Sequence, residues 1–345
     1  MTTLEFTLPA ELEAHEPPEA RGLARDRVRL LVGYRADNSL EHHRFTELPT
    51  LLRPGDVLVV NTSGTLPAAV GVTGGTLAVH FSTELPDGTW LVELRRDTGK
   101  ATEPYPLAKA GERYPLPGNA TLTLRAPFSA GRLWVASLDT PVLPYLTTFG
   151  APIRYSYVRQ RWPLSYYQTV FGITPGSAEM PSAARPFTDR MVSRLVSAGI
   201  GFAPVLLHTG VASPEAHERP YPERYVVPAH TARIVNQARA AGGRIIAIGT
   251  TAVRALESAA SPAGVISPAA GWTELIVTPE RGVRAIDGLL TGFHEPRASH
   301  LDMLTAIAGL PLLDHTYTEA IVAGYLWHEF GDVNLLLPKR LKSIP

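Results

Sequence analysis

The residues best suited to chemistry follow an apolar run that ends at Gly249, where a helical pattern begins within two residues. At such a start the free backbone N–H groups meet the positive end of the helix dipole, and the hydroxyls of Thr250 and Thr251 add donors and acceptors. A carboxylate or a ribose hydroxyl would suit this site, and an ordinary threonine-capped helix is the alternative. Arg254 and Glu257 stand three residues apart on the same helix, close enough for a surface ion pair.

Two histidines stand where a side chain could transfer a proton. His294 lies on a loop bounded by glycine and proline, beside a carboxylate, and a histidine there can act as acid, base or donor near neutral pH. His208 ends an expected strand, a position that favours a site over core filling in an α/β sheet. A structural or merely solvated histidine is the alternative at both positions.

Several common fingerprints are missing from the sequence. It has no GxGxxG motif after a strand, no P-loop, no GxSxG motif and no HExxH motif. Cysteine is also absent, which excludes disulfides, thiolate metal sites and a cysteine nucleophile. We therefore expect no metal and none of the common dinucleotide, NTP or hydrolase sites.

The elements that must hold these residues change character along the chain. From about residue 165 strands and helices are expected to alternate, with a helix over 188–199, a strand over 202–207 and an apolar strand over 244–248. Such alternation predicts a parallel sheet covered by helices. Between about 70 and 150, short strand-like runs recur with Gly, Pro and Asp between them, which predicts a small antiparallel barrel or sandwich.

The sequence thus predicts an α/β fold with a mainly parallel sheet, flanking helices from both chain ends, and an inserted small antiparallel β-barrel. Residues 1–69 and 151–345 are expected to form the α/β domain, and residues 70–150 the barrel. A length of 345 residues fits two domains better than one ordinary core.

Composition limits the partners. Lys and Arg number 32, as do Asp and Glu, and this balance argues mildly against a protein held on RNA mainly by phosphate contacts. Hydrophobic residues make up 45% of the chain, but no apolar run reaches the length of a membrane span. The acidic start of the chain is unlike a secretory signal, so we expect a cytoplasmic protein without a membrane partner.

Taken in order, these segments resemble the S-adenosylmethionine:tRNA ribosyltransferase-isomerases of queuosine biosynthesis along nearly the whole chain. The best-matching stretch runs from Gly249 to Ser258, and residues 52–61 match as well. Other matching segments are Tyr167-Gln168-Thr169-Val170, Leu207-His208 with Gly210, Glu223 with Pro228, Asp287-Gly288-Leu289 with Thr291, Phe293-His294 with Pro296, and Gly331-Asp332.

The resemblance implies an α/β domain with an inserted barrel and S-adenosylmethionine (SAM) used as a substrate. In this family the ribosyl part of SAM is transferred to the aminomethyl group of a 7-deazaguanine (preQ1) in tRNA. Epoxyqueuosine forms, and adenine and methionine are released. Such a site needs a general base, donors that help adenine leave, and an anchor for the methionine carboxylate.

The resemblance also implies roles for individual residues. The catalytic candidates, which could transfer protons or accept hydrogen bonds from ribose or amine groups, are His208, His294, Glu223 and Asp332. The helix start and a guanidinium could hold a carboxylate or hydroxyls. The residues expected to bind SAM are Tyr167, Gln168, Thr169, Gly249, Thr250, Thr251, Arg254 and Phe293.

Departures from the family pattern fall on the substrate side. Two arginines are replaced, which would weaken anion or phosphate contacts, and a histidine is replaced by Pro186, which cannot transfer a proton. The changed positions include Gly64, Ala69, Pro186, Ser213, Tyr221 and Gly292. Near the end, the family's Arg-Phe-Phe-Ser-Tyr stretch is Leu326-Trp327-His328-Glu329-Phe330.

Four functions remain open at this point. The first is the family reaction on tRNA, and the second is a SAM- or nucleoside-using enzyme that acts on a small molecule. The others are a non-catalytic binding paralogue and an RNA-binding module without chemistry. The oligomeric state is not indicated by the sequence.

Overall fold

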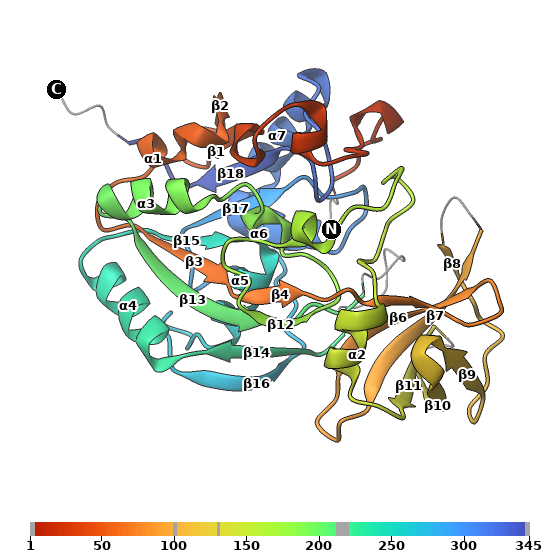
Figure 1. Ribbon diagram of the computed structural model, residues 1–345. Coiled ribbons are helices and arrows are strands. Elements are labelled where there is room, and N and C mark those ends of the chain that lie inside the picture. Colours follow the sequence, from red (N-terminus) through yellow and green to blue (C-terminus); the bar gives the residue numbers. More distant parts are fainter. Residues whose placement is uncertain (1–3, 99–101, 130–131, 212–220, 342–345) are drawn as a thin grey trace.

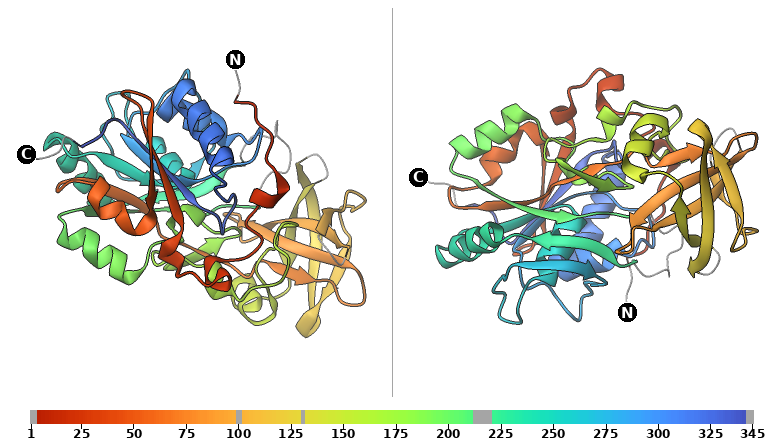
Figure 2. Two further views of the ribbon diagram at one scale, coloured as in Figure 1. Left: turned by 90° about the horizontal axis from the view of Figure 1, so that it is seen from above. Right: turned by 60° about the horizontal axis from the view of Figure 1, so that its bottom comes forward.

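The computed structural model describes residues 4–98, 102–129, 132–211 and 221–341, and in this part of the chain two large β-sheets lie beside each other (Figure 1). Strands of the larger sheet come from both ends of the chain, whereas those of the smaller sheet come from the single stretch 69–138. In the other views the smaller sheet forms a lobe at one side of the larger one (Figure 2).

The larger sheet has nine strands in the described part of the chain. They are β1 (Arg29–Tyr34), β2 (Ser39–Arg44), β3 (Val57–Asn61), β13 (Gly201–Leu207), β14 (Glu223–Val227), β15 (Ile245–Ile248), β16 (Ala269–Thr273), β17 (Gly288–Gly292) and β18 (Val333–Leu337). Their order across the sheet is β16-β14-β13-β3-β15-β17-β18-β1-β2.

Helices accompany both sheets, α2 beside the smaller one and the others beside the larger, and short 3-10 turns connect the elements. The α-helices are α1 (Leu48–Leu51), α2 (Val142–Phe149), α3 (Asp189–Ser197), α4 (Ala229–Ala240), α5 (Thr250–Ser258), α6 (His300–Ala308) and α7 (Leu310–Val322). The 3-10 turns are η1 (Ala10–Leu12), η2 (Pro18–Arg21), η3 (Arg25–Arg27), η4 (Phe45–Glu47), η5 (Pro117–Asn119), η6 (Leu164–Tyr167) and η7 (Ser182–Ala184).

The fold is mixed α/β. The sequence predicts a mainly parallel sheet, whereas the larger sheet contains both parallel and antiparallel strand pairs. Strands β13, β3, β15 and β17 run parallel to their neighbours in the centre, as does β1 to β18. The pairs β1–β2, β13–β14, β14–β16 and β17–β18 are antiparallel. Apolar runs such as β3 and β15 are buried throughout and mark the centre. No sequence pattern indicates the direction of β18, because a buried apolar strand can pair in either orientation.

Alternate side chains of the central strands reach two separate apolar layers. Val57 and Val59 of β3 join the core that includes residues of α4, α5, α6 and α7, whereas Leu58 and Val60 join the core that includes residues of α3. The predicted N-cap of α3 is confirmed, since Thr188 Oγ1 accepts a hydrogen bond of 3.1 Å from the N–H of Met191. The sheet is thus covered on both faces.

The smaller sheet is antiparallel and has its own apolar core. Its strands are β5 (Ala69–Gly71), β6 (Leu77–Glu84), β7 (Trp90–Asp97), β8 (Thr102–Pro104), β9 (Arg113–Leu116), β10 (Ala120–Ser129) and β11 (Leu133–Leu138). The end strands β5 and β9 do not pair as a ladder in the described residues, so strand pairing leaves the expected barrel open. Beside these ends, the N–H of Thr73 donates to the carbonyl of Pro115 at 2.8 Å.

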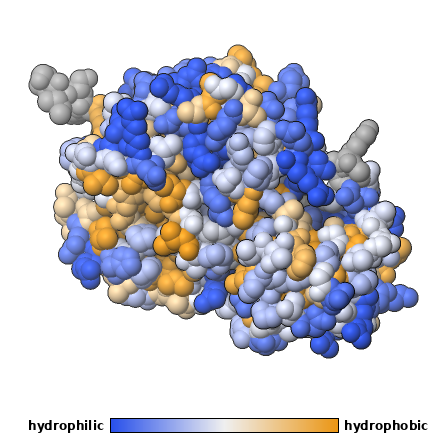
Figure 3. Space-filling model, viewed as in Figure 1, coloured by the Kyte–Doolittle hydropathy of each residue, from blue (hydrophilic) through white to orange (hydrophobic). Residues whose placement is uncertain are grey.

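Two more short strands, β4 (Ser63–Thr65) and β12 (Thr174–Ser177), pair in parallel between the two sheets. On the face shown in Figure 3, hydrophilic residues cover most of the surface, and the larger hydrophobic patch lies on the side of α3 and α4. None of the helices in the described part of the chain is long and apolar enough to cross a membrane.

A buried ion pair joins the turns that lead into two central strands. Asp56, directly before β3, is fully buried and accepts hydrogen bonds from the backbone N–H groups of Arg53 and Arg244, both at 3.0 Å. The Arg244 guanidinium adds bonds of 3.0 and 2.5 Å. Burial opposes ionisation of Asp56, but these hydrogen bonds and the positive charge hold its pKa below its usual range. The pair thereby fixes the starts of β3 and β15.

Replacing Asp56 with Ala should lower the free energy of unfolding by about 3–5 kcal/mol, because the Arg244 guanidinium would stay buried without its partner. Asp314→Ala, on the exposed side of α7, is the matched control and should change stability by less than about 0.5 kcal/mol. Urea unfolding of both variants measures the difference. Equal stability of the two variants would contradict a structural role for this pair.

Candidate functional site

A pocket of about 320 Å³ lies at the carboxyl ends of β15 and β17. Its walls are segments far apart in the sequence, namely the start of α5, the loop after β17, the loops at 152–157 and 178–183, and residues 328–329. In sheets with parallel central strands, this edge is where ligands bind. The pocket is therefore the best candidate for the functional site.

The residues predicted for the site divide into two groups. Those that line the pocket are Tyr167, Gly249, Thr250, Thr251, Phe293 and His294. Those that lie outside its lining are Gln168, Thr169, His208, Glu223, Arg254 and Asp332.

The turn at Gly249 forms one wall. Its φ of 88° and ψ of 157° belong to a region that essentially only glycine adopts, and they let β15 pass into α5 within one residue. Gly249 itself is the N-cap, and no side chain caps the first turn in the described part of the chain. The alternative of a threonine-capped helix is therefore wrong. Thr251 Oγ1 accepts from Asn61 Nδ2 at 3.1 Å, and Thr250 and Thr251 both face the pocket with the helix start.

His294 lies in the pocket wall and is held on several sides. Its Nε2 is 2.9 Å from Thr291 Oγ1, and its ring stacks on His300 with 4.7 Å between centroids. Its backbone N–H donates to the Tyr317 hydroxyl at 3.1 Å, and its carbonyl accepts from Trp327 Nε1 at 3.0 Å. Burial, together with the neighbouring imidazoles, lowers the pKa of His294 well below its usual value, so the ring is neutral near pH 7.

His208 occupies a structural position instead. Its Nδ1 is 2.7 Å from Ser63 Oγ, which is in turn 2.6 Å from Ser177 Oγ. The ring also packs against Gly176, where an added Cβ would come within 2.3 Å of it. Burial, with a smaller contribution from Arg224, lowers the pKa of His208 to about 4. The imidazole thus joins the end of β13 to β4 and β12.

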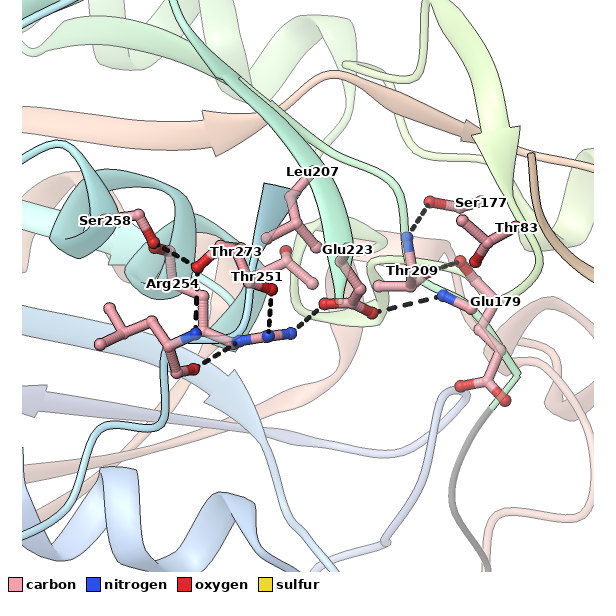
Figure 4. A network of polar contacts seen from close by, with 12 residues as sticks. Thr83, Ser177, Glu179, Leu207, Thr209, Glu223, Thr251, Arg254, Ser258 and Thr273 are labelled. Atoms are coloured by element: carbon pink, nitrogen blue, oxygen red, sulfur yellow. Dashed lines mark hydrogen bonds and ion pairs between the residues drawn. The ribbon is translucent and has the colours of Figure 1, made fainter. Parts of the chain in front are cut away.

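Arg254 and Glu223 pair with each other. The Arg254 guanidinium donates to the Glu223 carboxylate and to the backbone carbonyls of Leu275 and Thr273 at 3.1 and 3.3 Å. Figure 4 shows Glu223 reaching Arg254, and the other carboxylate oxygen accepts from the N–H of Gly210 at 3.3 Å. Burial raises the pKa of Glu223 although Arg254 opposes the shift.

The expected surface pair between Arg254 and Glu257 is therefore wrong. Glu257 is buried, accepts from Arg281 Nη1 at 2.8 Å, and accepts from the backbone N–H groups of Arg284 and Ala285 at 2.7 Å each. Both side chains point to partners in other segments, because a buried charge needs several hydrogen bonds that a neighbour on its own helix does not supply.

Three other predicted residues lie outside the lining of the pocket, and two of them hold backbone segments. Gln168 accepts from the N–H of Thr65 at 3.0 Å and donates to its carbonyl at 2.8 Å, and thereby fixes β4. Asp332 accepts from the N–H groups of Arg29 and Leu326 at 2.7 and 2.9 Å, which closes the turn before β18. Thr169 is buried, and its hydroxyl has no partner within the described residues.

Sequence reasoning missed a cluster in the pocket wall formed by Tyr157, His328 and Glu329. The Tyr157 hydroxyl donates to Glu329 Oε2, and the Tyr157 ring stacks on His328 with 3.8 Å between centroids and 11° between planes. Burial raises the pKa of Glu329 to about 7 and lowers that of His328 to about 4. The sequence did offer one signal for this cluster. His328 and Glu329 both depart from the family pattern, and Glu329 places a carboxylate where that pattern has a serine.

The cluster is held by the beginning of the chain. The N–H of Trp327 donates to the carbonyl of Leu12 at 2.8 Å, and the N–H of Ala14 donates to the carbonyl of Trp327 at 3.3 Å. His15 Nδ1 is 2.7 Å from the Tyr157 carbonyl. An N-terminal segment thus braces the wall that carries Glu329.

The other departures from the family pattern lie in various places. Gly292 lines the pocket, whereas Gly64, Ala69, Pro186 and Tyr221 are outside its lining. Ser213 lies outside the described residues. In the part of the chain that is described, no three His, Asp or Glu side chains gather in a way that could hold a metal ion.

Comparison with known proteins gives consistent likenesses. A family described as "Queuosine biosynthesis protein" matches residues 1–336. An S-adenosylmethionine:tRNA ribosyltransferase-isomerase of Symbiobacterium thermophilum is 33% identical over 353 residues, which cover 98% of this chain and 99% of that protein. One of Acidiphilium cryptum is 34% identical and covers 97% of this chain and 99% of its own length. A crystal structure of S-adenosylmethionine tRNA ribosyltransferase from Thermotoga maritima matches with a TM-score of 0.55 and 27% identity, over 97% of this chain and 99% of that one.

Because burial raises the pKa of Glu329 from 4.5 to about 7, the unfolded chain ionises this group at a lower pH than the folded chain. The contribution of Glu329 to the free energy of unfolding is therefore complete below pH 4.5, and it is lost as the pH rises from 4.5 through 7. Relative to Glu329→Gln, the wild-type free energy of unfolding should fall by about 1–3 kcal/mol across this range. Urea unfolding between pH 4.5 and pH 8 measures it, with Glu84→Gln at the exposed end of β6 as control. A constant difference would contradict the burial of the charge.

Proposed function

The chain belongs to the family of queuosine biosynthesis proteins, and we propose on this premise that it transfers the ribosyl part of SAM to preQ1 in tRNA. The products are epoxyqueuosine in the tRNA, free adenine and free methionine. The observation that carries the proposal is a likeness to ribosyltransferase-isomerases that extends over 97–98% of the chain. The pocket at the end of β15 and β17 is the proposed site.

SAM is the first substrate, and the residues of the pocket wall suit its parts. The start of α5 offers backbone N–H groups, the positive end of a helix dipole and the hydroxyls of Thr250 and Thr251, which suit a carboxylate. The aromatic faces of Tyr167 and Phe293 line the same pocket and can pack against a purine.

The reaction begins with removal of the C5′ proton, which the adjacent sulfonium makes acidic. Adenine then leaves, the substrate amine attacks the ribosyl part, and cleavage of the C5′–S bond as the epoxide closes releases methionine. His294 is assigned to proton transfer because it lines the pocket and its imidazole is neutral. His208 lies outside the pocket wall and is assigned to positioning β13 against β4 and β12.

Arg254 and Glu223 are proposed to position the helix start rather than to touch SAM. Arg254 is on α5 and Glu223 is on β14, so their ion pair ties the helix to the sheet a turn beyond Thr250 and Thr251. Gln168 and Asp332 receive the same kind of role, because both bond to backbone groups, whereas Thr169 makes no side-chain hydrogen bond in the described residues that would support one.

We also assign residues 1–69 and 151–345 to the SAM-binding domain and residues 70–150 to an inserted β-barrel domain. Two features support the division: the strands of the smaller sheet come from one stretch, and their side chains form a separate apolar core. tRNA is the second substrate, and the protein is assigned to the cytoplasm, where tRNA is modified.

Purified protein incubated with SAM and preQ1-bearing tRNA should release adenine in equal amount to the modified nucleoside formed. SAM alone, or SAM with tRNA that lacks preQ1, should release none. Chromatography of adenine and of digested tRNA measures both products. Turnover with a small amine instead of tRNA would favour a small-molecule acceptor. Failure to bind SAM by calorimetry would leave a non-catalytic binding paralogue or an RNA-binding module without chemistry.

Thr250→Val should weaken SAM binding roughly 2- to 12-fold, the loss of one hydrogen bond of about 0.5–1.5 kcal/mol. The substitution keeps the β-branched shape and removes only the hydroxyl. Thr305→Val is the matched control, because this hydroxyl bonds to the Leu301 carbonyl on α6 away from the pocket. Titration calorimetry compares the variants, and an unchanged affinity in Thr250→Val would remove the helix start from the SAM site.

A further inference from the structure

The pocket has an unusual charge for an enzyme that acts on a nucleic acid. Its lining in the described part of the chain includes the carboxylates Glu179, Glu295 and Glu329 but neither lysine nor arginine. Two of its imidazoles, His294 and His328, have a pKa that burial lowers, so they add no positive charge near pH 7. The ionisable groups of the described lining that can carry charge near pH 7 are therefore acidic, which suits a cation rather than a phosphate.

Glu329 is the carboxylate of the pocket lining that has a buried oxygen without a hydrogen bond in the described residues. Its Oε2 accepts from the Tyr157 hydroxyl, whereas its Oε1 is buried and receives no hydrogen bond from any described residue. Leaving a buried acceptor unsatisfied is unfavourable, and the penalty is larger when the acceptor is charged. The nearby cation Arg185 is occupied elsewhere, since it donates to Glu19 at 2.8 Å and to the Tyr166 carbonyl at 2.9 Å.

Aromatic side chains line the same pocket as this carboxylate. The Tyr157 ring lies between Tyr155, at 5.6 Å between centroids and 13° between planes, and His328. Tyr155, Tyr157 and Tyr167 all line the pocket. Aromatic faces attract organic cations through their ring quadrupole, and a carboxylate at the same place adds a full charge. Such a wall can recognise a sulfonium or an ammonium group.

We propose that Glu329, fixed by Tyr157, is the counter-charge of a cationic group on the substrate and sets the selectivity of the pocket for that group. The inference rests on the proposed function, whose substrates offer two such groups, the sulfonium of SAM and the ammonium of preQ1. An ammonium would satisfy Oε1 with a hydrogen bond, whereas a sulfonium would meet it by charge alone. The family stretch that residues 326–330 resemble has serine at this position, so the resemblance implies that the counter-charge is a feature of this chain.

The test compares each cation with a neutral analogue, using the whole 345-residue chain. Titration calorimetry measures binding of SAM against S-adenosylhomocysteine, whose sulfur is uncharged, and of free preQ1 against 7-cyano-7-deazaguanine, which has no amine. Glu329→Gln should reduce the preference for the cation over its neutral analogue about tenfold or more in one of the two pairs. The affinity for the neutral analogue should stay within about twofold, which also shows that the variant folds.

The pair that changes identifies the cation. Loss of preference in the SAM pair assigns Glu329 to the sulfonium, and loss in the preQ1 pair assigns it to the amine. Glu329→Asp retains the charge and should keep part of the preference, whereas Glu84→Gln, on the smaller sheet, should keep all of it. Unchanged preferences in both pairs would overturn the inference while leaving the proposed function in place. A wild-type protein that binds none of the four compounds would instead overturn the proposed function, and the inference with it.

Discussion

The parallel alignment of β3, β15 and β17 is the constraint from which the rest of the site follows. Strands that run side by side in one direction end at one edge, so the segments that follow them meet there whatever their separation in the sequence. The buried pair of Asp56 and Arg244 fixes the starts of two of these strands, and the strained turn at Gly249 makes the exit from β15 abrupt enough for α5 to begin at the edge.

Local patterns in the sequence predicted the parts of this arrangement that depend on neighbours along the chain. The Thr188 cap, the apolar β15 and the start of α5 all follow from residue types within one or two turns. The direction of β18 could not be predicted in this way, because an apolar strand fits either orientation. The partner of Arg254 was also missed, since Glu223 is 31 residues away and approaches only once β14 pairs with β13.

Local sequence patterns predicted even less of the site. The sequence pointed to His294 and to Thr250 and Thr251, which line the pocket, but it also pointed to His208, which lies behind it. A strand-end position does not determine which way a side chain turns, and here Ser63 and Gly176 determine it. Tyr157 and Glu329 are 172 residues apart, so no spacing rule could join them. Ion pairs between residues far apart in the sequence determine which charged groups face a ligand, because an arginine that is paired with a buried acid is not available in the pocket.

The bracing of the Glu329 wall by residues 12–15 has a consequence for how the protein matures on the ribosome. Backbone bonds between Leu12, Ala14 and Trp327 join segments synthesised more than 300 residues apart. The wall that carries Glu329 therefore cannot form until residues 326–329 have been synthesised and have reached residues 12–15, so an N-terminal fragment that lacks them has no complete pocket.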